Sequence, residues 1–175
     1  MMTKDLSSFK TPLLSHLDTK GEATMVDVGG KSATQRRAVA GCEIRMKPEA
    51  LSLLQNGQIK KGDAFTVAKT AGILAAKKTA ELIPLCHPLP LEYIEILFFD
   101  RPAGDGVFIR SEVRTTAKTG VEMEALAAAM TAALTIYDMA KSYDPAMVIT
   151  NLQLIKKTGG KSDYSINQSR NSNSE

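Results

Sequence analysis

The stretch LEYIEILFFDRPAGDGVFIRSEVRT, residues 91–115, decides the predicted fold. Its first and last parts, residues 91–99 and 106–115, are rich in aromatic and β-branched residues, which is typical of strands. The connection between them, DRPAGDG, contains the Pro, Gly and Asp residues that form turns. We therefore predict two strands joined by a turn.

A long helix is predicted on each side of these strands. Residues 63–83 are rich in Ala, Leu and Lys, with Asp63 as the N-cap and Pro84 as the stop. The second helix spans residues 122–143, where small Ala and Thr side chains recur and allow another backbone to approach closely. Packing against its own sheet explains this pattern. A contact with another subunit is the alternative, because a helix that is apolar on much of its circumference buries more than one face.

The outer parts of the chain complete the pattern. Residues 23–28 and 34–46 alternate with a period of two, and the apolar run 147–155 is typical of a final strand. Pro48 opens a short helix that Asn56 and Gly57 close. The order of elements predicts an α+β, ferredoxin-like split β-α-β sandwich. Its antiparallel sheet carries the helices on one face, with an extra N-terminal strand and a short helix added.

The length of 175 residues fits one domain. We predict a flexible N-terminal extension over residues 1–20, a single ferredoxin-like domain over residues 21–164, and a disordered polar tail over residues 165–175. The sequence shows neither a signal peptide nor a membrane-spanning run, so we expect a cytoplasmic protein without membrane contact.

Composition narrows the class of ligand. A net charge of +3 suits an anionic ligand, but with 5% aromatic residues and no Trp the chain has little from which to build a base-stacking platform, so nucleic acid is not the expected partner. The only cysteines are Cys42 and Cys86, which form no disulfide framework. Together with His16 and His87 they lack the spacing of a zinc site, and no metal site is predicted.

Several polar residues have both a functional and a structural explanation. A lysine before a turn, such as Lys61, is most often a solvated loop residue. A histidine among apolar neighbours, such as His87, is as often a buried, hydrogen-bonded imidazole as a functional one. Cys86 acts as a nucleophile only with a base beside it, and in an extended segment the side chain of His87 points the other way. The helix dipole alone favours carboxylates near a helix start, as at Glu122 and Glu124.

Two further features are equally open. Asp138 and Lys141 are spaced i, i+3, so a surface ion pair explains them. The segment KKTGGKS, residues 156–162, ends like a phosphate-binding loop, but Ile155 stands where that motif needs Gly and a polar tail follows where it needs a helix. Its backbone amides and lysines still suit a clamp for a phosphorylated ligand, and the alternative is an ordinary mobile tail.

Longer strings are more specific than these single residues. LCHPL (85–89), KTGVEMEAL (118–126), AALTIYDMAK (132–141) and KTGGKS (157–162) together resemble the cyclic pyranopterin monophosphate synthase family, the MoaC proteins of molybdenum cofactor biosynthesis. Three more segments match the family in order: MVDVGGK (25–31), the T-x-R-x-A-x-A pattern (34–40) and KGD (61–63). The resemblance therefore extends from about residue 21 to residue 162.

The resemblance implies a phosphorus-oxygen lyase. The family converts 3′,8-cyclo-7,8-dihydroguanosine 5′-triphosphate, a nucleotide-derived substrate, into cyclic pyranopterin monophosphate and releases pyrophosphate. It assembles as a homohexamer, a trimer of dimers, with active sites at the dimer interface. No resident cofactor is implied, and any magnesium ion is expected to arrive with the triphosphate.

The resemblance also assigns residues. Asp138 is the general acid or base, with Lys61 and Lys141 as its cationic partners. The purine-derived ring is lined by Leu85, Cys86, His87, Met123 and Glu124, with Glu122 close by. The residues that the resemblance assigns to the triphosphate are Arg36, Lys118, Lys157 and Lys161. We expect Asp138 to be ionised and to act as a base, and Lys61 or Lys141 to act as an acid with a lowered pKa.

Two details qualify this assignment. If Glu124 and Asp138 belong to one unbroken helix, about 21 Å of helix axis separates them. Either the Glu124 segment is not helical, or the site takes residues from two chains, which the family's oligomer implies. In addition, Asp163 stands where family members commonly have Gly, and this brings an acidic group into the predicted phosphate clamp.

Two other classes of function compete with the synthase. One is a ferredoxin-like module that binds RNA or another protein through its basic C-terminal segment. The other is a scaffold that has lost its activity. Retention of Lys61, His87, Glu124, Asp138 and Lys141 together argues against the scaffold, because a decayed site has no reason to keep all five.

Overall fold

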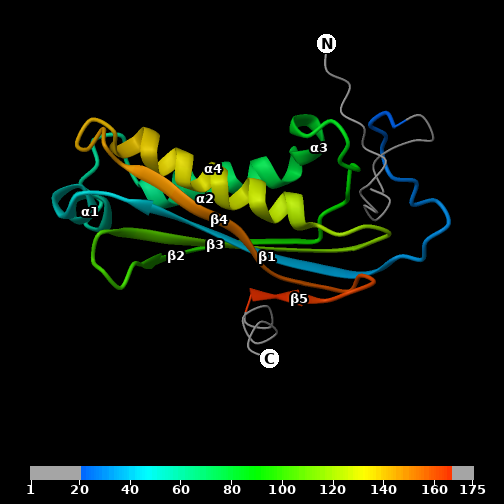
Figure 1. The fold of residues 1–175 in the computed structure, drawn as a ribbon. Coiled ribbons are helices and arrows are strands. Elements are labelled where there is room, and N and C mark those ends of the chain that lie inside the picture. Colours follow the sequence, from blue (N-terminus) through cyan, green and yellow to red (C-terminus); the bar gives the residue numbers. More distant parts are fainter. Residues whose placement is uncertain (1–20, 167–175) are drawn as a thin grey trace, which may run out of the picture.

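The computed structural model describes residues 21–166. The predicted N-terminal extension, His16 and residues 167–175 of the predicted tail lie outside the described residues. Within residues 21–166, one antiparallel five-stranded sheet in the order β2-β3-β1-β4-β5 carries the helices on one face (Figure 1). The predicted ferredoxin-like α+β arrangement is confirmed.

The elements follow the chain in an order close to the predicted one. They are β1 (Thr34–Arg45), α1 (Pro48–Gln55), α2 (Ala64–Lys77), α3 (Thr79–Leu82), β2 (Tyr93–Asp100), β3 (Gly106–Ala117), α4 (Glu122–Ala140), β4 (Val148–Thr158) and β5 (Tyr164–Ser165). Two predicted helix signals are confirmed. Pro48 opens α1, and the carboxylate of Asp63 caps α2 by accepting the backbone N–H of Thr66 at 3.1 Å.

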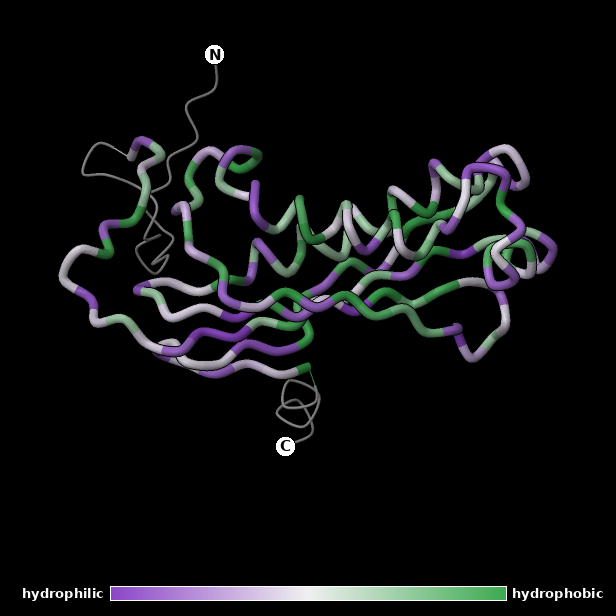
Figure 2. The backbone as a smooth tube through the Cα atoms, turned by 180° about the vertical axis from the view of Figure 1, so that it is seen from behind, coloured by the Kyte–Doolittle hydropathy of each residue, from purple (hydrophilic) through white to green (hydrophobic). Residues whose placement is uncertain are grey.

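Strand β1 lies at the centre of the sheet and fixes its register. It pairs with β3 from Thr34 opposite Ala117 to Arg45 opposite Gly106. On its other side it pairs with β4, with register shifts between Val39 and Ala40 and again between Gly41 and Glu43. Hydrophobic and hydrophilic residues alternate along the long strands (Figure 2), as expected for a sheet with one covered face.

Small side chains bring α4 close to its neighbours, as predicted. Six of its seven alanines, including Ala128 and Ala132, are fully buried in the core. On α2, a Cβ at Gly72 would lie 2.7 Å from the carbonyl oxygen of Ala128 and 2.3 Å from Cδ1 of Ile96, so only glycine fits there. The packing of α4 on its own sheet is thus confirmed, while Met130, on the outer side of the same helix, is half exposed.

Two predicted elements differ in the structure. Residues 23–28 form no strand, because β1 is already paired on both sides, and Ala23 alone makes a bridge. The predicted helix over residues 63–83 is broken at Lys78, whose φ and ψ are −108° and 11°. The buried hydroxyl of Thr79 donates to the carbonyl of Ala75 at 3.0 Å, a side-chain bond that competes with the regular helical pattern.

The predicted end of the second long helix and the predicted start of the C-terminal tail also differ from the structure. Helix α4 ends at Ala140 rather than Tyr143, because the carbonyl of Ala140 accepts the backbone N–H of both Tyr143 and Asp144. The predicted disordered tail begins at Ser165, but Ser165 belongs to β5 and pairs with Lys156. A two-residue strand gives no periodic signal in the sequence.

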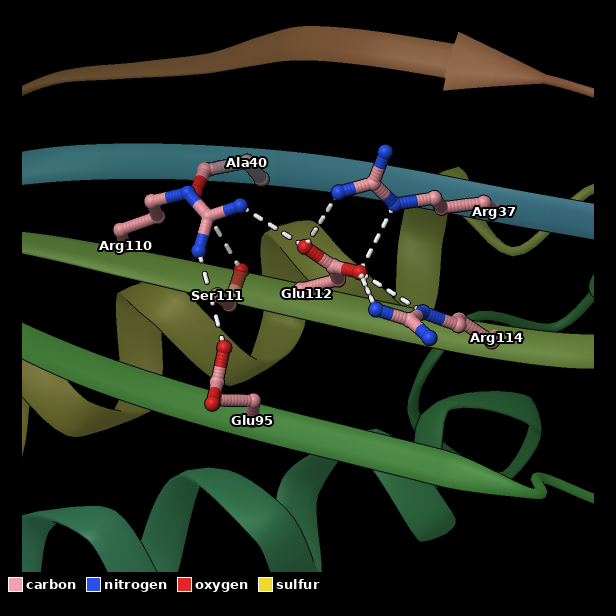
Figure 3. Close-up of polar contacts among 7 residues, drawn as sticks. All are labelled: Arg37, Ala40, Glu95, Arg110, Ser111, Glu112 and Arg114. Carbon is pink, nitrogen blue, oxygen red and sulfur yellow. Dashed lines mark hydrogen bonds and ion pairs between the residues drawn. The ribbon is translucent and has the colours of Figure 1, made fainter.

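The face of the sheet opposite the helices holds a network of charges (Figure 3). The carboxylate of Glu112 on β3 is buried and lies between three guanidinium groups, those of Arg37, Arg110 and Arg114. Arg37 binds it through two hydrogen bonds of 2.7 Å. The hydrogen bonds from these arginines, first of all Arg37, lower the pKa of Glu112 to about 2. No helix within residues 21–166 has the length and apolar character needed to cross a membrane.

Candidate functional site

The residues predicted to surround a ring lie together in one pocket. The segment that follows α3 brings Leu85, Cys86 and His87 to the N-terminal end of α4, which supplies Met123 and Glu124. The pocket has a volume of about 410 Å³. Glu122 lines it as well, as do five residues that the sequence did not single out for it: Val26, Lys31, Leu89, Thr119 and Gly120. All six predicted ring-lining residues are therefore in one place. We refer to this hollow as the ring pocket.

Burial shapes the chemistry of the ring pocket. Glu124 is only 4% exposed, and desolvation raises the pKa of its carboxyl group above that of an ordinary glutamate. Desolvation, followed by the nearby charge of Glu124, raises the pKa of the Cys86 thiol. A thiol that stays protonated is a poor nucleophile, which argues against a nucleophilic role for Cys86.

A second pocket, lined by cations, adjoins the first. It has a volume of about 150 Å³, and we refer to it as the anion pocket. It is lined by Arg36, Arg37, Gly120, Glu122, Lys157, Thr158, Gly160, Lys161 and Ser162. Three of the four residues predicted to bind the triphosphate are therefore in this pocket. The fourth, Lys118, directly follows β3 and contacts the same corner, because Nη2 of Arg36 donates to its carbonyl at 3.2 Å.

Glu122 connects the two pockets. It lines both of them, as Gly120 does, and its Oε1 lies 3.2 Å from Nζ of Lys157. The two pockets are therefore neighbours, which suits a ligand with a ring at one end and phosphate groups at the other.

The glycine-rich segment between β4 and β5 forms one wall of the anion pocket. Gly159 has a positive φ of 87°, and a Cβ there would lie 1.8 Å from the carbonyl oxygen of Gln35, so the turn requires glycine. The carboxylate of Asp163 accepts the backbone N–H of Gly159 at 3.1 Å. The acidic residue thus stabilises the turn and occupies an amide that a phosphate group would otherwise contact. The short strand β5 follows this segment, where a phosphate-binding loop needs a helix and the sequence indicated a polar tail.

Asp138 and its two lysines form a third cluster, at the C-terminal end of α4. Nζ of Lys61 lies 2.9 Å from Oδ2 of Asp138 and also donates to its backbone carbonyl at 2.8 Å. Nζ of Lys141 lies 2.8 Å from Oδ1. The sequence-distant Lys61 therefore joins the i, i+3 pair, which the surface-pair interpretation did not include.

The charges of this cluster stabilise one another. Hydrogen bonds from Lys141 and then Lys61 lower the pKa of Asp138 to about 2, in the direction that the expected ionised carboxylate requires. Asp138 in turn raises the pKa of Lys141. The expectation of a lowered pKa is therefore wrong for Lys141, because in this chain a carboxylate rather than a crowd of cations faces it.

The Asp138 cluster is far from the two pockets within one chain. Helix α4 is continuous from Glu122 to Ala140, so the alternative that Glu124 lies outside the helix is excluded. The rise of an α-helix places Asp138 roughly 21 Å along the axis from Glu124. The structure brings the ring-lining and triphosphate residues together and leaves the catalytic trio apart.

Charged and backbone contributors to the pockets are among the residues that sequence reasoning missed. Arg37 lines the anion pocket beside Arg36, and Val26 and Lys31 line the ring pocket. Lys31 and Val26 belong to the matched string MVDVGGK, which was the available signal. Within residues 21–166 no group of three or more His, Cys, Asp and Glu side chains has an arrangement that could hold a metal ion.

Comparison with known proteins gives a consistent set of similarities. A family model described as the MoaC family matches residues 25–160. The cyclic pyranopterin monophosphate synthase of Pelotomaculum thermopropionicum is 56% identical over 149 residues, which are 85% of this chain and 88% of that protein. The protein of the same name from Herpetosiphon aurantiacus is 56% identical over 148 residues, 85% of this chain and 90% of that protein. The one from Trichodesmium erythraeum is 51% identical over 166 residues, 94% of this chain and 99% of that protein.

Proposed function

The chain belongs to the MoaC family, and we infer that it is a cyclic pyranopterin monophosphate synthase, a lyase of molybdenum cofactor biosynthesis. The observation that carries this proposal is the pair of adjoining pockets that share Glu122, one suited to a ring and one to an anion. The substrate is 3′,8-cyclo-7,8-dihydroguanosine 5′-triphosphate, which has both parts.

The substrate spans the two pockets in a defined direction. Its purine-derived ring occupies the ring pocket, where the buried carboxyl group of Glu124 and the imidazole of His87 offer hydrogen bonds. Its triphosphate occupies the anion pocket, where Arg36, Lys157 and Lys161 supply positive charge. Glu122, at the junction, orients Lys157 through their ion pair.

A second copy of the chain completes the site. The enzyme is a homohexamer, a trimer of dimers, and Asp138 with its lysines reaches the pockets of the partner across the dimer interface. The continuity of α4 supports this arrangement, because one chain alone leaves Asp138 roughly 21 Å from Glu124. Half-exposed apolar side chains on the outer faces of α2 and α4, among them Leu74, Met130 and Leu134, also support it.

The chemistry is acid-base and electrostatic. The ionised carboxylate of Asp138 accepts a proton from the substrate during rearrangement of the ring system. Lys61 and Lys141 then stabilise the negative charge that develops. A hydroxyl oxygen attacks the α-phosphorus, and the bond to the bridging oxygen of the β-phosphate breaks, which releases pyrophosphate. Cationic side chains of the anion pocket stabilise that leaving group.

Compartment and cofactor belong to the same proposal. Cys42 and Cys86 are free thiols, which fits a reducing compartment, and we place the enzyme in the cytoplasm. It needs no resident cofactor, and any magnesium ion enters with the triphosphate.

A turnover assay tests the proposal. Purified protein is incubated with the cyclised dihydroguanosine triphosphate, and both pyrophosphate release and the pterin product are measured. We expect product from the wild type and a loss of at least about a hundredfold in kcat in Asp138→Asn and Lys61→Ala. We expect no loss in the control Lys78→Ala, because the exposed pair of Lys78 with Glu81 lines neither pocket. A folded wild-type protein without product contradicts the proposal.

Mixing two inactive variants tests the shared site. Asp138→Asn removes the proton acceptor that one chain supplies to the site of its partner. Glu124→Ala removes a carboxyl group of the chain's own ring pocket. If the site takes residues from two chains, mixed oligomers contain some sites with both residues intact and recover part of the activity. Absence of recovery in oligomers shown to have exchanged subunits contradicts the interface proposal.

A further inference from the structure

The loop of residues 25–31 forms one wall of the ring pocket and contacts His87 through its backbone. Nε2 of His87 lies 2.9 Å from the carbonyl oxygen of Val26. Val26 and Lys31 both line the pocket. From the other side, Nζ of Lys118 donates to the carbonyl of Gly29 at 2.6 Å. One loop therefore contacts a side chain from the ring pocket and another assigned to the triphosphate.

Internal hydrogen bonds hold this loop in its bent shape. Oδ1 of Asp27 accepts the backbone N–H of Gly29 at 2.7 Å, which is the pattern of an Asx turn. The backbone N–H of Lys31 donates to the carbonyl of Val28 at 3.1 Å. The position of the Val26 carbonyl thus depends on the side chain of its neighbour, Asp27.

The contact with Val26 decides which nitrogen of His87 carries the proton. A carbonyl oxygen only accepts hydrogen bonds, so Nε2 must be the donor. In a neutral imidazole the other nitrogen, Nδ1, is then unprotonated and accepts. Within residues 21–166, Nδ1 of His87 has no hydrogen-bond partner, and His87 lines the ring pocket.

We propose that residues 25–31 are a positioning loop that fixes the Nε2–H tautomer of His87, so that Nδ1 accepts a hydrogen bond from an N–H or O–H group of the ligand in the ring pocket. The identity of that ligand rests on the proposed function, whereas the tautomer does not. His87 on this basis recognises a hydrogen-bond donor, and a ligand with only an acceptor at that position is disfavoured, because two acceptors would face each other.

Long-range proton–nitrogen NMR of the full chain tests the tautomer directly. The chain has only two histidines, so a His16→Gln variant keeps a single histidine and assigns its signals to His87. At a pH where the ring is neutral, we expect the spectrum of an Nε2–H imidazole, with a large difference between the two nitrogen shifts. A predominant Nδ1–H form, or an averaged mixture of the two, overturns the proposal.

A matched pair of variants at Asp27 tests the role of the loop. Asp27→Ala removes the acceptor for Gly29, whereas Asp27→Asn keeps a side-chain oxygen at that position. We expect Asp27→Ala to shift His87 toward a mixture of tautomers and to raise KM about fivefold with kcat within about twofold of wild type. We expect Asp27→Asn to behave like wild type. An unchanged tautomer in folded Asp27→Ala overturns the role of the loop.

Two variants of His87 separate its two nitrogens. Asn places an amide close to the position of Nδ1, and Gln places one close to that of Nε2. If Nδ1 contacts the ligand, His87→Asn binds the cyclised triphosphate more tightly than His87→Gln, and the reverse order overturns the proposal. If the wild type makes no pterin product but keeps the Nε2–H tautomer, the proposed function fails and the tautomer assignment stands.

Discussion

Nζ of Lys157 lies 3.2 Å from Oε1 of Glu122, at the junction of the ring pocket and the anion pocket. The cation on β4 and the carboxylate that opens α4 are far apart in the sequence, and the sheet brings them together through β1, which pairs with β4 and packs against α4. This pair joins the two halves of the proposed substrate site.

The neighbouring lysines on β4 give a controlled test of the anion pocket. Lys157 lines the pocket, whereas Lys156 is exposed and lies outside it. We expect Lys157→Met to raise KM for the triphosphate substrate about tenfold, because a charge-assisted contact with phosphate is lost. Lys156→Met removes the same charge and is expected to change KM by less than about twofold. Equal effects in steady-state kinetics would mean that only the overall charge of the protein matters.

The buried Glu112 predicts a dependence of stability on acid. Its pKa is about 2 when folded, well below that of an unfolded glutamate, so its ionisation stabilises the folded state at neutral pH. That stabilisation is lost as the pH falls from about 4.5 toward 2. Glu112→Gln leaves three arginines without their shared carboxylate, and we expect the free energy of unfolding at neutral pH to fall by about 3 kcal/mol.

Urea unfolding between pH 7 and pH 3 checks this expectation, with Glu95→Gln as the control. Glu95 contacts only Arg110 in this network, at 3.7 Å, and its side chain is 35% exposed, so its loss is expected to cost less than about 1 kcal/mol. A Glu112→Gln variant with the same stability and the same slope against pH as the wild type rules out the network as a source of stability.

Much of the fold was predictable from the sequence because its signals are local. The strands of residues 91–115 and the helix caps at Asp63 and Pro48 depend on neighbouring residues only, and all of them are observed. The break at Lys78 was not predicted, because it depends on the hydroxyl of Thr79 bonding to Ala75, and β5 is too short to give a pattern.

The candidate site was predictable in its residue types but not in its geometry. The matched strings supplied the ring-lining residues, and these lie in one pocket. Val26 was missed because it acts through its backbone carbonyl, which no side-chain pattern reveals. Lys141 was expected to have a lowered pKa, but the carboxylate of Asp138, 2.8 Å from its Nζ, raises that pKa instead. The i, i+3 spacing had already indicated this ion pair.

The close approach of α2 to α4 makes Gly72 sensitive to a single methyl group. A Cβ at this position would lie 2.7 Å from the backbone oxygen of Ala128, and that oxygen belongs to a packed helix. We therefore expect Gly72→Ala to lower the free energy of unfolding by about 2 kcal/mol, although alanine favours helices. Gly30→Ala, at a site with open space around it, is the control. If Gly72→Ala is as stable as the wild type in urea unfolding, α2 and α4 can move apart at little cost and the prediction is wrong.

The two lysines around Asp138 are expected to contribute unequally to its ionisation. Because both lower its pKa and Lys141 has the larger effect, Asp138 stays ionised down to about pH 2. In carbon-13 NMR titrations of the carboxyl group, Lys141→Met should raise the pKa of Asp138 more than Lys61→Met does, and the double variant should bring it close to that of an ordinary aspartate. The two single variants are matched in charge and length, so each serves as the control for the other. If neither substitution moves the pKa, the lysines do not hold the carboxylate in its basic form, and the proposed role of Asp138 as a proton acceptor loses its electrostatic basis.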